Sequence, residues 1–146
     1  DVEDNILEAK KSVSMLNISY SDIVIGLAAS GNTPFTVKVI EESNKMNALT
    51  IGIGNNPGGW IQKIAKYGIT LDTGYEILAG STRLKAGTSQ KICLNLISTL
   101  VMTKLGNVQN GMMINMLAKN KKLKERKLKI NKSLLLNKSF ENIKQN

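Results

Sequence analysis

The stretch that most constrains the fold is residues 22–34, which reads D-I-V-I-G-L-A-A-S-G-N-T-P. Its apolar first half has hydrophobic side chains on both faces, as in a parallel strand that helices cover on each side. Gly31 then allows a tight turn, Thr33 is a favourable N-cap, and Pro34 suits the first position of a helix. The stretch therefore predicts a strand, a tight turn and the start of a helix.

The predicted helix start offers a place for an anion. The backbone N–H groups and partial positive charge of the helix N-terminus would lie beside the hydroxyls of Ser30 and Thr33. Phosphosugar-binding and nucleotide-binding folds both contain such turns, and many such turns bind nothing. The motif favours a phosphate site but leaves the ligand open.

The chain on either side of this stretch alternates between helix and strand patterns. We expect a short helix within residues 1–21, an amphipathic helix over 34–46, a buried strand over 48–53, a short helix over 60–67 and a brief strand over 69–71. The turn cluster G-N-N-P-G-G follows the second strand. This order predicts an α/β, Rossmann-like fold with a parallel sheet, here of about three strands.

A long apolar helix is predicted to follow the motif S-T-R-L-K-A-G-T-S-Q-K and to end near Gly106. It is apolar over more than one stripe, so we expect it to be buried on two sides, against the sheet and against a partner subunit. Arg83 and Lys85 lie at its start, where the helix macrodipole disfavours each cation by about 0.3–1 kcal/mol. A bound anion would reverse that cost, although surface cations near a helix start are also common.

The last part of the chain is strongly basic. Residues 107–120 predict a turn and a short methionine-rich helix, and the run 119–132 then supplies most of the net charge of +9. This run lacks an aromatic residue for base stacking and has only a ragged apolar stripe. A basic helix could lie on nucleic acid or on an anionic membrane, but we expect a solvated, lysine-rich helix that contacts neither. We divide the chain into a domain over 1–118 and a basic helical tail over 119–146.

Composition excludes several classes of site. The chain has no histidine and one cysteine, Cys93, so zinc sites and histidine-based triads lack their ligands and base. We expect Cys93 to be a small buried hydrophobe. A single cysteine suits a reducing cytoplasm, and neither a signal peptide nor an apolar run of about 18 residues is apparent.

Three motifs together resemble the N-acetylmuramic acid 6-phosphate etherase family, which belongs to the SIS (sugar isomerase) domain superfamily and is related to the glucokinase regulatory protein. They are G-L-A-A-S-G-N-T-P (26–34), A-G-S-T-R-L-K-A-G-T-S-Q-K (79–91) and L-N-L-I-S-T (94–99). The resemblance implies a three-layer sandwich with a parallel sheet between helices. It also implies a homodimer that removes D-lactate from N-acetylmuramic acid 6-phosphate, leaving N-acetylglucosamine 6-phosphate. The resemblance implies that neither a cofactor nor a metal is used.

The resemblance also assigns site residues. The family has a Glu-Asp pair shortly before the Ala-Ala-Ser-Gly strand, and Glu3-Asp4 matches it, which makes Glu3 the catalytic acid/base. A carboxylate in that place can take the C2 proton of the opened sugar, so that the lactyl ether at C3 leaves. The substrate-binding candidates are Ser30, Gly31, Asn32, Thr33, Glu76, Ser81, Thr82, Arg83, Lys85 and Thr88.

The chain also departs from the family pattern. Asn32 stands where arginine is usual, Asn115 replaces an aspartate, and the second glutamate and phosphate loop of the family's upstream part have no counterpart here. We therefore expect either a piece of a longer etherase or a decayed copy, inactive alone. The alternatives to the lyase are a non-catalytic sugar-phosphate-binding module that regulates a partner, and an inactive truncated remnant.

Overall fold

The computed structural model describes residues 2 to 143 of the chain, and their side chains as far as residue 135. The chain divides into two compact units, unit 1 over residues 1–94 and unit 2 over residues 95–146. The boundary between the units, at residues 94 and 95, lies earlier in the chain than the predicted domain boundary at residues 118 and 119. The predicted domain boundary stays a prediction. Each unit is described by itself.

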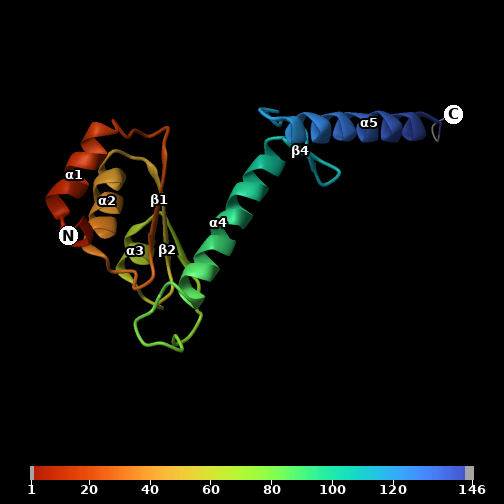
Figure 1. Ribbon diagram of the computed structural model, residues 1–146. Coiled ribbons are helices and arrows are strands. Elements are labelled where there is room, and N and C mark those ends of the chain that lie inside the picture. The colour runs from red at the N-terminus through yellow and green to blue at the C-terminus, as the bar shows by residue number, and fades with distance from the viewer. Residues whose placement is uncertain (1, 144–146) are drawn as a thin grey trace. The chain divides into compact units, whose positions relative to one another are not determined.

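Unit 1 contains a parallel three-stranded sheet in the order β1 (Ile23–Ala28), β2 (Leu49–Gly54) and β3 (Tyr67–Thr70) (Figure 1). The three predicted strands are confirmed, with β3 starting two residues earlier than the pattern indicated because the preceding helix is shorter. Gly26, Gly52 and Gly68 lie side by side in register across the sheet. The predicted α/β fold with a parallel sheet is thus confirmed.

Helices α2 (Pro34–Lys45) and α3 (Trp60–Ile64) cover one face of this sheet. The row of glycines allows their close approach: a Cβ at Gly26 would lie 3.0 Å from Ile40 of α2, and one at Gly52 or Gly68 would collide with the backbone of α3. Ile40 and Ile61 are fully buried as a result. On the opposite face Ile53 is fully buried, whereas Leu27 is half-buried.

The N-terminal segment packs on the outer side of α2. It consists of the 3-10 turn η1 (Val2–Asp4) and helix α1 (Ile6–Met15), which buries Ala9 and Val13. The Asn5 side chain begins α1 by accepting a hydrogen bond from the Glu8 backbone N–H at 3.0 Å. Because η1 contacts α2, the acidic residues of η1 lie close to the start of that helix.

Helix α4 (Lys85–Lys104) begins in unit 1 and ends in unit 2, and Gly106 follows it with a φ of 73°, as expected for a helix end. Within this chain α4 is largely exposed, since Ala86 is its buried residue while Leu96 and Leu100 are 58% and 60% exposed. Burial of its second side against a partner subunit stays a prediction. Cys93, expected to be buried, is half-buried.

Unit 2 contains a small hairpin where a methionine-rich helix was predicted. Strands β4 (Val108–Gln109) and β5 (Met112–Met113) pair antiparallel around Asn110 and Gly111, whose φ values are 50° and 72°. Asn-Gly at two positive φ angles forms the tight hairpin turn that matches strand twist, and this local preference outweighs the helical spacing of the methionines.

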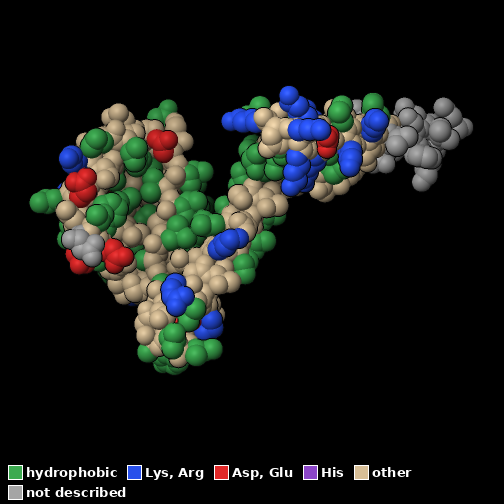
Figure 2. Space-filling view, in the orientation of Figure 1, with side chains coloured by type: hydrophobic (Ala, Val, Ile, Leu, Met, Phe, Trp, Pro, Cys, Tyr) green, Lys and Arg blue, Asp and Glu red, His purple; other side chains and the backbone are tan. Residues whose placement is uncertain are grey.

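Helix α5 (Lys121–Ile143) confirms that the basic run is helical from Lys121 onward, and its described lysine and arginine side chains, as far as Lys132, are exposed (Figure 2). Ile130 is its buried residue among those whose side chains are described. In the described part of the chain, no helix combines the length and the hydropathy required to cross a bilayer.

Candidate functional site

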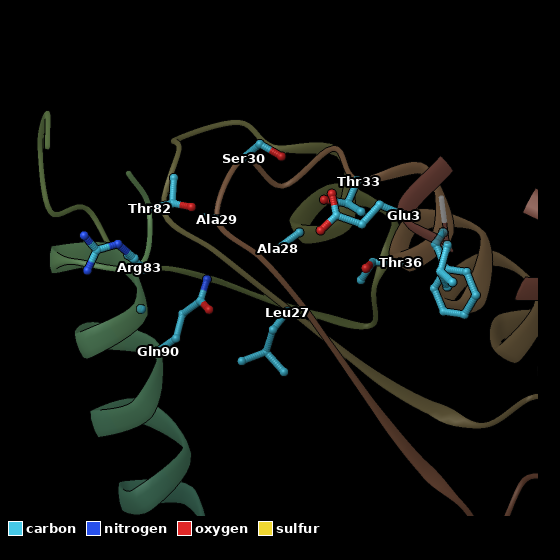
Figure 3. A pocket seen from close by; sticks show the side chains of 13 residues that line it. Glu3, Leu27, Ala28, Ala29, Ser30, Thr33, Thr36, Thr82, Arg83 and Gln90 are labelled. Carbon is cyan, nitrogen blue, oxygen red and sulfur yellow. The ribbon is translucent and has the colours of Figure 1, made fainter. Parts of the chain in front are cut away.

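The candidate site is a cavity of about 610 Å³ in unit 1, at the carboxyl end of β1. Three segments that are distant in sequence form it: η1, the turn from β1 into α2, and the segment that leads into α4 (Figure 3). The carboxyl ends of parallel strands and the adjoining helix starts are where open α/β folds bind ligands. The fold thus places the cavity where a ligand is expected.

Five of the predicted site residues line this cavity, namely Glu3, Ser30, Thr33, Thr82 and Arg83. The Glu3 carboxylate lies beside Thr33, and Thr82 and Arg83 lie across from them on the α4 side (Figure 3). The cavity therefore has an acidic group on one wall and Arg83 on the other, with hydroxyl groups around it, although in this view the guanidinium extends away from Glu3 (Figure 3). Such a set can hold an anionic, hydroxyl-rich molecule against a carboxylate.

The start of α2 contributes unpaired donors to the same space. Thr33 is the N-cap and Pro34 the first helical residue, as predicted, but the Thr33 side chain makes no capping hydrogen bond. Its hydroxyl is therefore available to a ligand. Phe35 and Thr36 line the cavity in the first turn, where helix N–H groups have no intrahelical acceptor.

Glu76 places a negative charge at the start of α4, where the sequence suggested a bound anion beside Arg83 and Lys85. Its carboxylate accepts hydrogen bonds from the backbone N–H groups of Ala86 at 2.9 Å and Lys85 at 3.0 Å. These bonds, that from Ala86 foremost, hold the pKa of Glu76 below its usual 4.5 although burial opposes the shift. Glu76 lines a neighbouring cavity of about 360 Å³, which shares Ser30 and Thr82 with the first.

Gly31 and Asn32 shape the turn and are not among the residues that line either of these two cavities. Gly31 has a φ of 74°, and a Cβ there would lie 2.6 Å from the Cα of Gly59, so any side chain would separate the two turns. The Asn32 side chain accepts a hydrogen bond from the Trp60 N–H at 3.0 Å and thereby caps α3.

The remaining predicted residues, Ser81, Lys85 and Thr88, lie in the segment that forms the α4 wall but do not line the two cavities. Ser81 accepts a backbone hydrogen bond from Leu84 at 3.1 Å, so it stabilises the turn that leads into α4. Lys85 and Thr88 are exposed on the first turns of α4. Their roles in binding stay predictions.

Sequence reasoning missed two polar residues of the site, Asn55 and Gln90. Asn55 directly follows β2 and is 7% exposed, and Gln90 lines the larger cavity from α4. The Gln90 Nε2 group donates to the Asn55 Oδ1 atom at 2.8 Å. Asn55 lies in the G-N-N-P-G-G turn, which was predicted only to end a strand, and Gln90 lies in the segment 79–91, where the predicted site residues were Ser81, Thr82, Arg83, Lys85 and Thr88.

A metal-binding group of three or more acidic, cysteine or histidine side chains does not occur among the described residues. The charged groups of the cavity are instead Glu3 and Arg83.

Comparisons with known proteins show the family of the chain. A family model described as the SIS domain matches residues 6–102. Similar proteins named N-acetylmuramic acid 6-phosphate etherase occur in Francisella tularensis, 44% identical over 124 residues, and in Halalkalibacterium halodurans, 41% identical over 128 residues. A third, from Actinobacillus pleuropneumoniae, is 38% identical over 128 residues.

These matches cover 85% to 88% of the chain but 42% to 43% of each relative. The chain therefore spans about two fifths of the length of the curated relatives that it matches. The resemblance inferred from the three motifs is confirmed.

Proposed function

Because this chain belongs to the SIS domain family, we propose that it forms one wall of the sugar-phosphate site of an N-acetylmuramic acid 6-phosphate etherase. The observation that carries the proposal is the cavity in which Glu3, the turn at Ser30 and the segment at Arg83 meet. The enzyme would be a carbon–oxygen lyase that releases D-lactate and leaves N-acetylglucosamine 6-phosphate.

Glu3 is the proposed base. In the opened sugar the C2 proton is acidic because it lies next to the C1 carbonyl, and a positioned carboxylate can remove it. The electron pair left at C2 then expels the lactate oxygen from C3, and water adds to the resulting double bond. The position of Glu3 beside Thr33, at one side of the cavity, supports this role.

The opposite parts of the cavity are proposed to hold the substrate in place. Ser30 and Thr33 would donate hydrogen bonds to sugar or phosphate oxygens, with the first turn of α2 adding backbone donors. Arg83 would pair with an anionic group of the substrate. A second copy of the chain would pack against α4 to form a homodimer. The proposed compartment is the cytoplasm.

The test is the release of D-lactate by the longest natural form of the protein incubated with N-acetylmuramic acid 6-phosphate. We expect lactate from the unaltered protein and a rate lower by about 10²- to 10⁴-fold in Glu3→Gln, since the variant cannot take the proton. Glu8→Gln serves as the control, because it removes the same charge from the first turn of α1, outside the cavity. A folded dimer that releases no lactate would contradict the proposal.

A non-catalytic sugar-phosphate-binding module is the second candidate. It is favoured by Asn32, which stands where the family usually has arginine and whose side chain is engaged with α3. This candidate requires calorimetric binding of N-acetylglucosamine 6-phosphate that survives Glu3→Gln, with no turnover by any form. A third candidate, an inactive remnant, requires that no sugar phosphate binds.

A further inference from the structure

A hydrogen-bonded pair of amide side chains, one buried and one half-buried, connects the end of the sheet to the wall of the larger cavity. Asn55, at the carboxyl end of β2, is 7% exposed, and Gln90 reaches it from α4. A buried amide with an unpaired polar atom is costly, so the direction of each hydrogen bond in such a pair is well determined. That direction decides which atoms Gln90 presents to the cavity.

The direction is set by a backbone carbonyl. The Asn55 Nδ2 group donates to the Leu71 carbonyl oxygen at 2.9 Å, and a carbonyl can only accept. The second Nδ2 hydrogen goes to the Ser89 hydroxyl at 2.9 Å, which itself donates to the Ala86 carbonyl at 2.8 Å. Both Asn55 donors are thereby used, so the Asn55 oxygen must face Gln90.

Gln90 is oriented in turn. Its Nε2 group donates to the Asn55 oxygen, which leaves its Oε1 atom and one N–H without a partner among the described residues. The Gln90 amide projects from α4 into the cavity, on the same wall as Thr82 and Arg83 (Figure 3). The cavity thus contains a fixed carbonyl acceptor beside a fixed N–H donor.

We propose that Gln90 binds an uncharged hydrogen-bond donor of the sugar, a hydroxyl or the acetamido N–H, and that Asn55 is its positioning residue. The inference rests on the proposed sugar-phosphate site and adds a residue to it. A carbonyl oxygen repels phosphate oxygens, so Gln90 faces the neutral part of the ligand. Arg83 and the first turn of α2 face the anionic part.

The first experiment measures calorimetric binding of two probes, N-acetylglucosamine 6-phosphate and inorganic phosphate, to the full chain and to Gln90→Met. Methionine keeps the length of the side chain but removes the amide. We expect the Kd for the sugar phosphate to rise about 10-fold, as for loss of one good hydrogen bond, and the Kd for phosphate to stay unchanged. Lys91→Met, an exposed neighbour on α4 outside the cavity, should change neither.

Glucose 6-phosphate distinguishes the two possible donors. If the acetamido N–H is the group bound, Gln90→Met and the unaltered chain will bind glucose 6-phosphate equally. If a hydroxyl is the group bound, the 10-fold difference will remain. Both results support the proposal, because in each case Gln90→Met binds N-acetylglucosamine 6-phosphate more weakly than the unaltered chain does.

The positioning role of Asn55 is tested by a double-mutant cycle. Asn55→Ala should weaken sugar-phosphate binding when Gln90 is present and should have no further effect in the Gln90→Met background. A merely structural role would weaken the binding of inorganic phosphate as well, and would persist in that background. If Asn55→Ala does not fold, the result with Gln90→Met alone decides whether Gln90 contacts the ligand.

The outcomes separate this inference from the proposed function. Binding of the sugar phosphate by the unaltered chain with no change in Gln90→Met, or equal losses for both probes, would overturn the inference and leave the proposed function standing. No sugar-phosphate binding by the unaltered chain would overturn the proposed function, and this inference with it.

Discussion

At the scale of single residues, Glu76 shows how a side chain can take the place of a ligand. Its carboxylate accepts both hydrogen bonds at the start of α4, and its pKa lies below 4.5. A carboxyl group whose pKa is lowered by folding stabilises the folded state above its unfolded pKa, and this contribution is lost as the pH falls through the folded pKa. The stabilisation is therefore complete near neutral pH.

We predict that Glu76→Gln lowers the urea midpoint at pH 7 and that the deficit shrinks as the pH falls below 4.5. The measurement is the urea midpoint of the unaltered chain and of the variant, taken at several pH values from 7 to below 4.5. Glu8→Gln is the matched control, because Glu8 is a glutamate at another helix start, in the first turn of α1, but its carboxylate accepts no hydrogen bond among the described residues. If Glu76→Gln lowered the urea midpoint equally at every pH, ionised Glu76 would not be what stabilises the start of α4.

Individual roles were harder to predict from the sequence than residue types. Ser30, Thr33 and Arg83 lie in the cavity because the helix starts that carry them are encoded locally, by Gly31, Pro34 and the motif around Arg83. The roles of Asn32 and Asn55 depend on partners 28 and 35 positions away along the chain, Trp60 and Gln90. No local pattern encodes such a partner.

At the scale of elements, the parallel strands and α2 could be predicted because their periodicity and their turn residues agree. The hairpin of unit 2 could not be predicted from periodicity, since its strands are two residues long each. The Asn110-Gly111 pair was the available signal, because both residues tolerate a positive φ. The Asn-Gly pair therefore predicts the local structure better than the spacing of the methionines beside it does.

Helix α4 has apolar side chains that this chain alone does not bury, with Leu96 and Leu100 one helical turn apart and 58% and 60% exposed. We predict self-association through this helix. Burial of one leucine contributes about 1.5–3 kcal/mol, so Leu96→Lys with Leu100→Lys should raise the dimer dissociation constant by at least about 100-fold.

Sedimentation equilibrium of the unaltered chain and of this variant measures the change. The control places lysine at Asn95 and Thr99 instead, which are exposed polar positions one residue earlier on the same turns. It adds the same charge without removing apolar surface. A chain that is monomeric before any substitution would contradict the prediction.

At the scale of the whole molecule, the two units differ in how much apolar surface they bury. Among the described side chains, the buried hydrophobic residues lie in unit 1 with the exception of Ile130. Local unfolding costs least where few apolar side chains are buried, so unit 2 should open first. The matched family region, residues 6–102, consists mostly of the better-packed unit.

We predict that a glutamate-specific protease cuts after Glu125 before it cuts after Glu41 or Glu42. Trypsin would be a poorer probe, because lysines are concentrated in α5, whereas glutamates are more frequent in unit 1. Mass spectrometry of the early fragments identifies the first site. First cleavage after Glu41 or Glu42 would show that α2 opens as readily as α5.

The Leu71 carbonyl that orients Asn55 belongs to the main chain, and no substitution of Leu71 removes it. By orienting Asn55, this carbonyl determines which atoms of the Gln90 amide are available to a ligand. The orientation of the amide therefore depends on the main chain at the end of the sheet. Exchanging the lining side chains other than Gln90 would therefore leave the orientation of this amide on the α4 wall unchanged. Keeping Gln90 but reversing its amide would require a change at position 55, below the cavity surface.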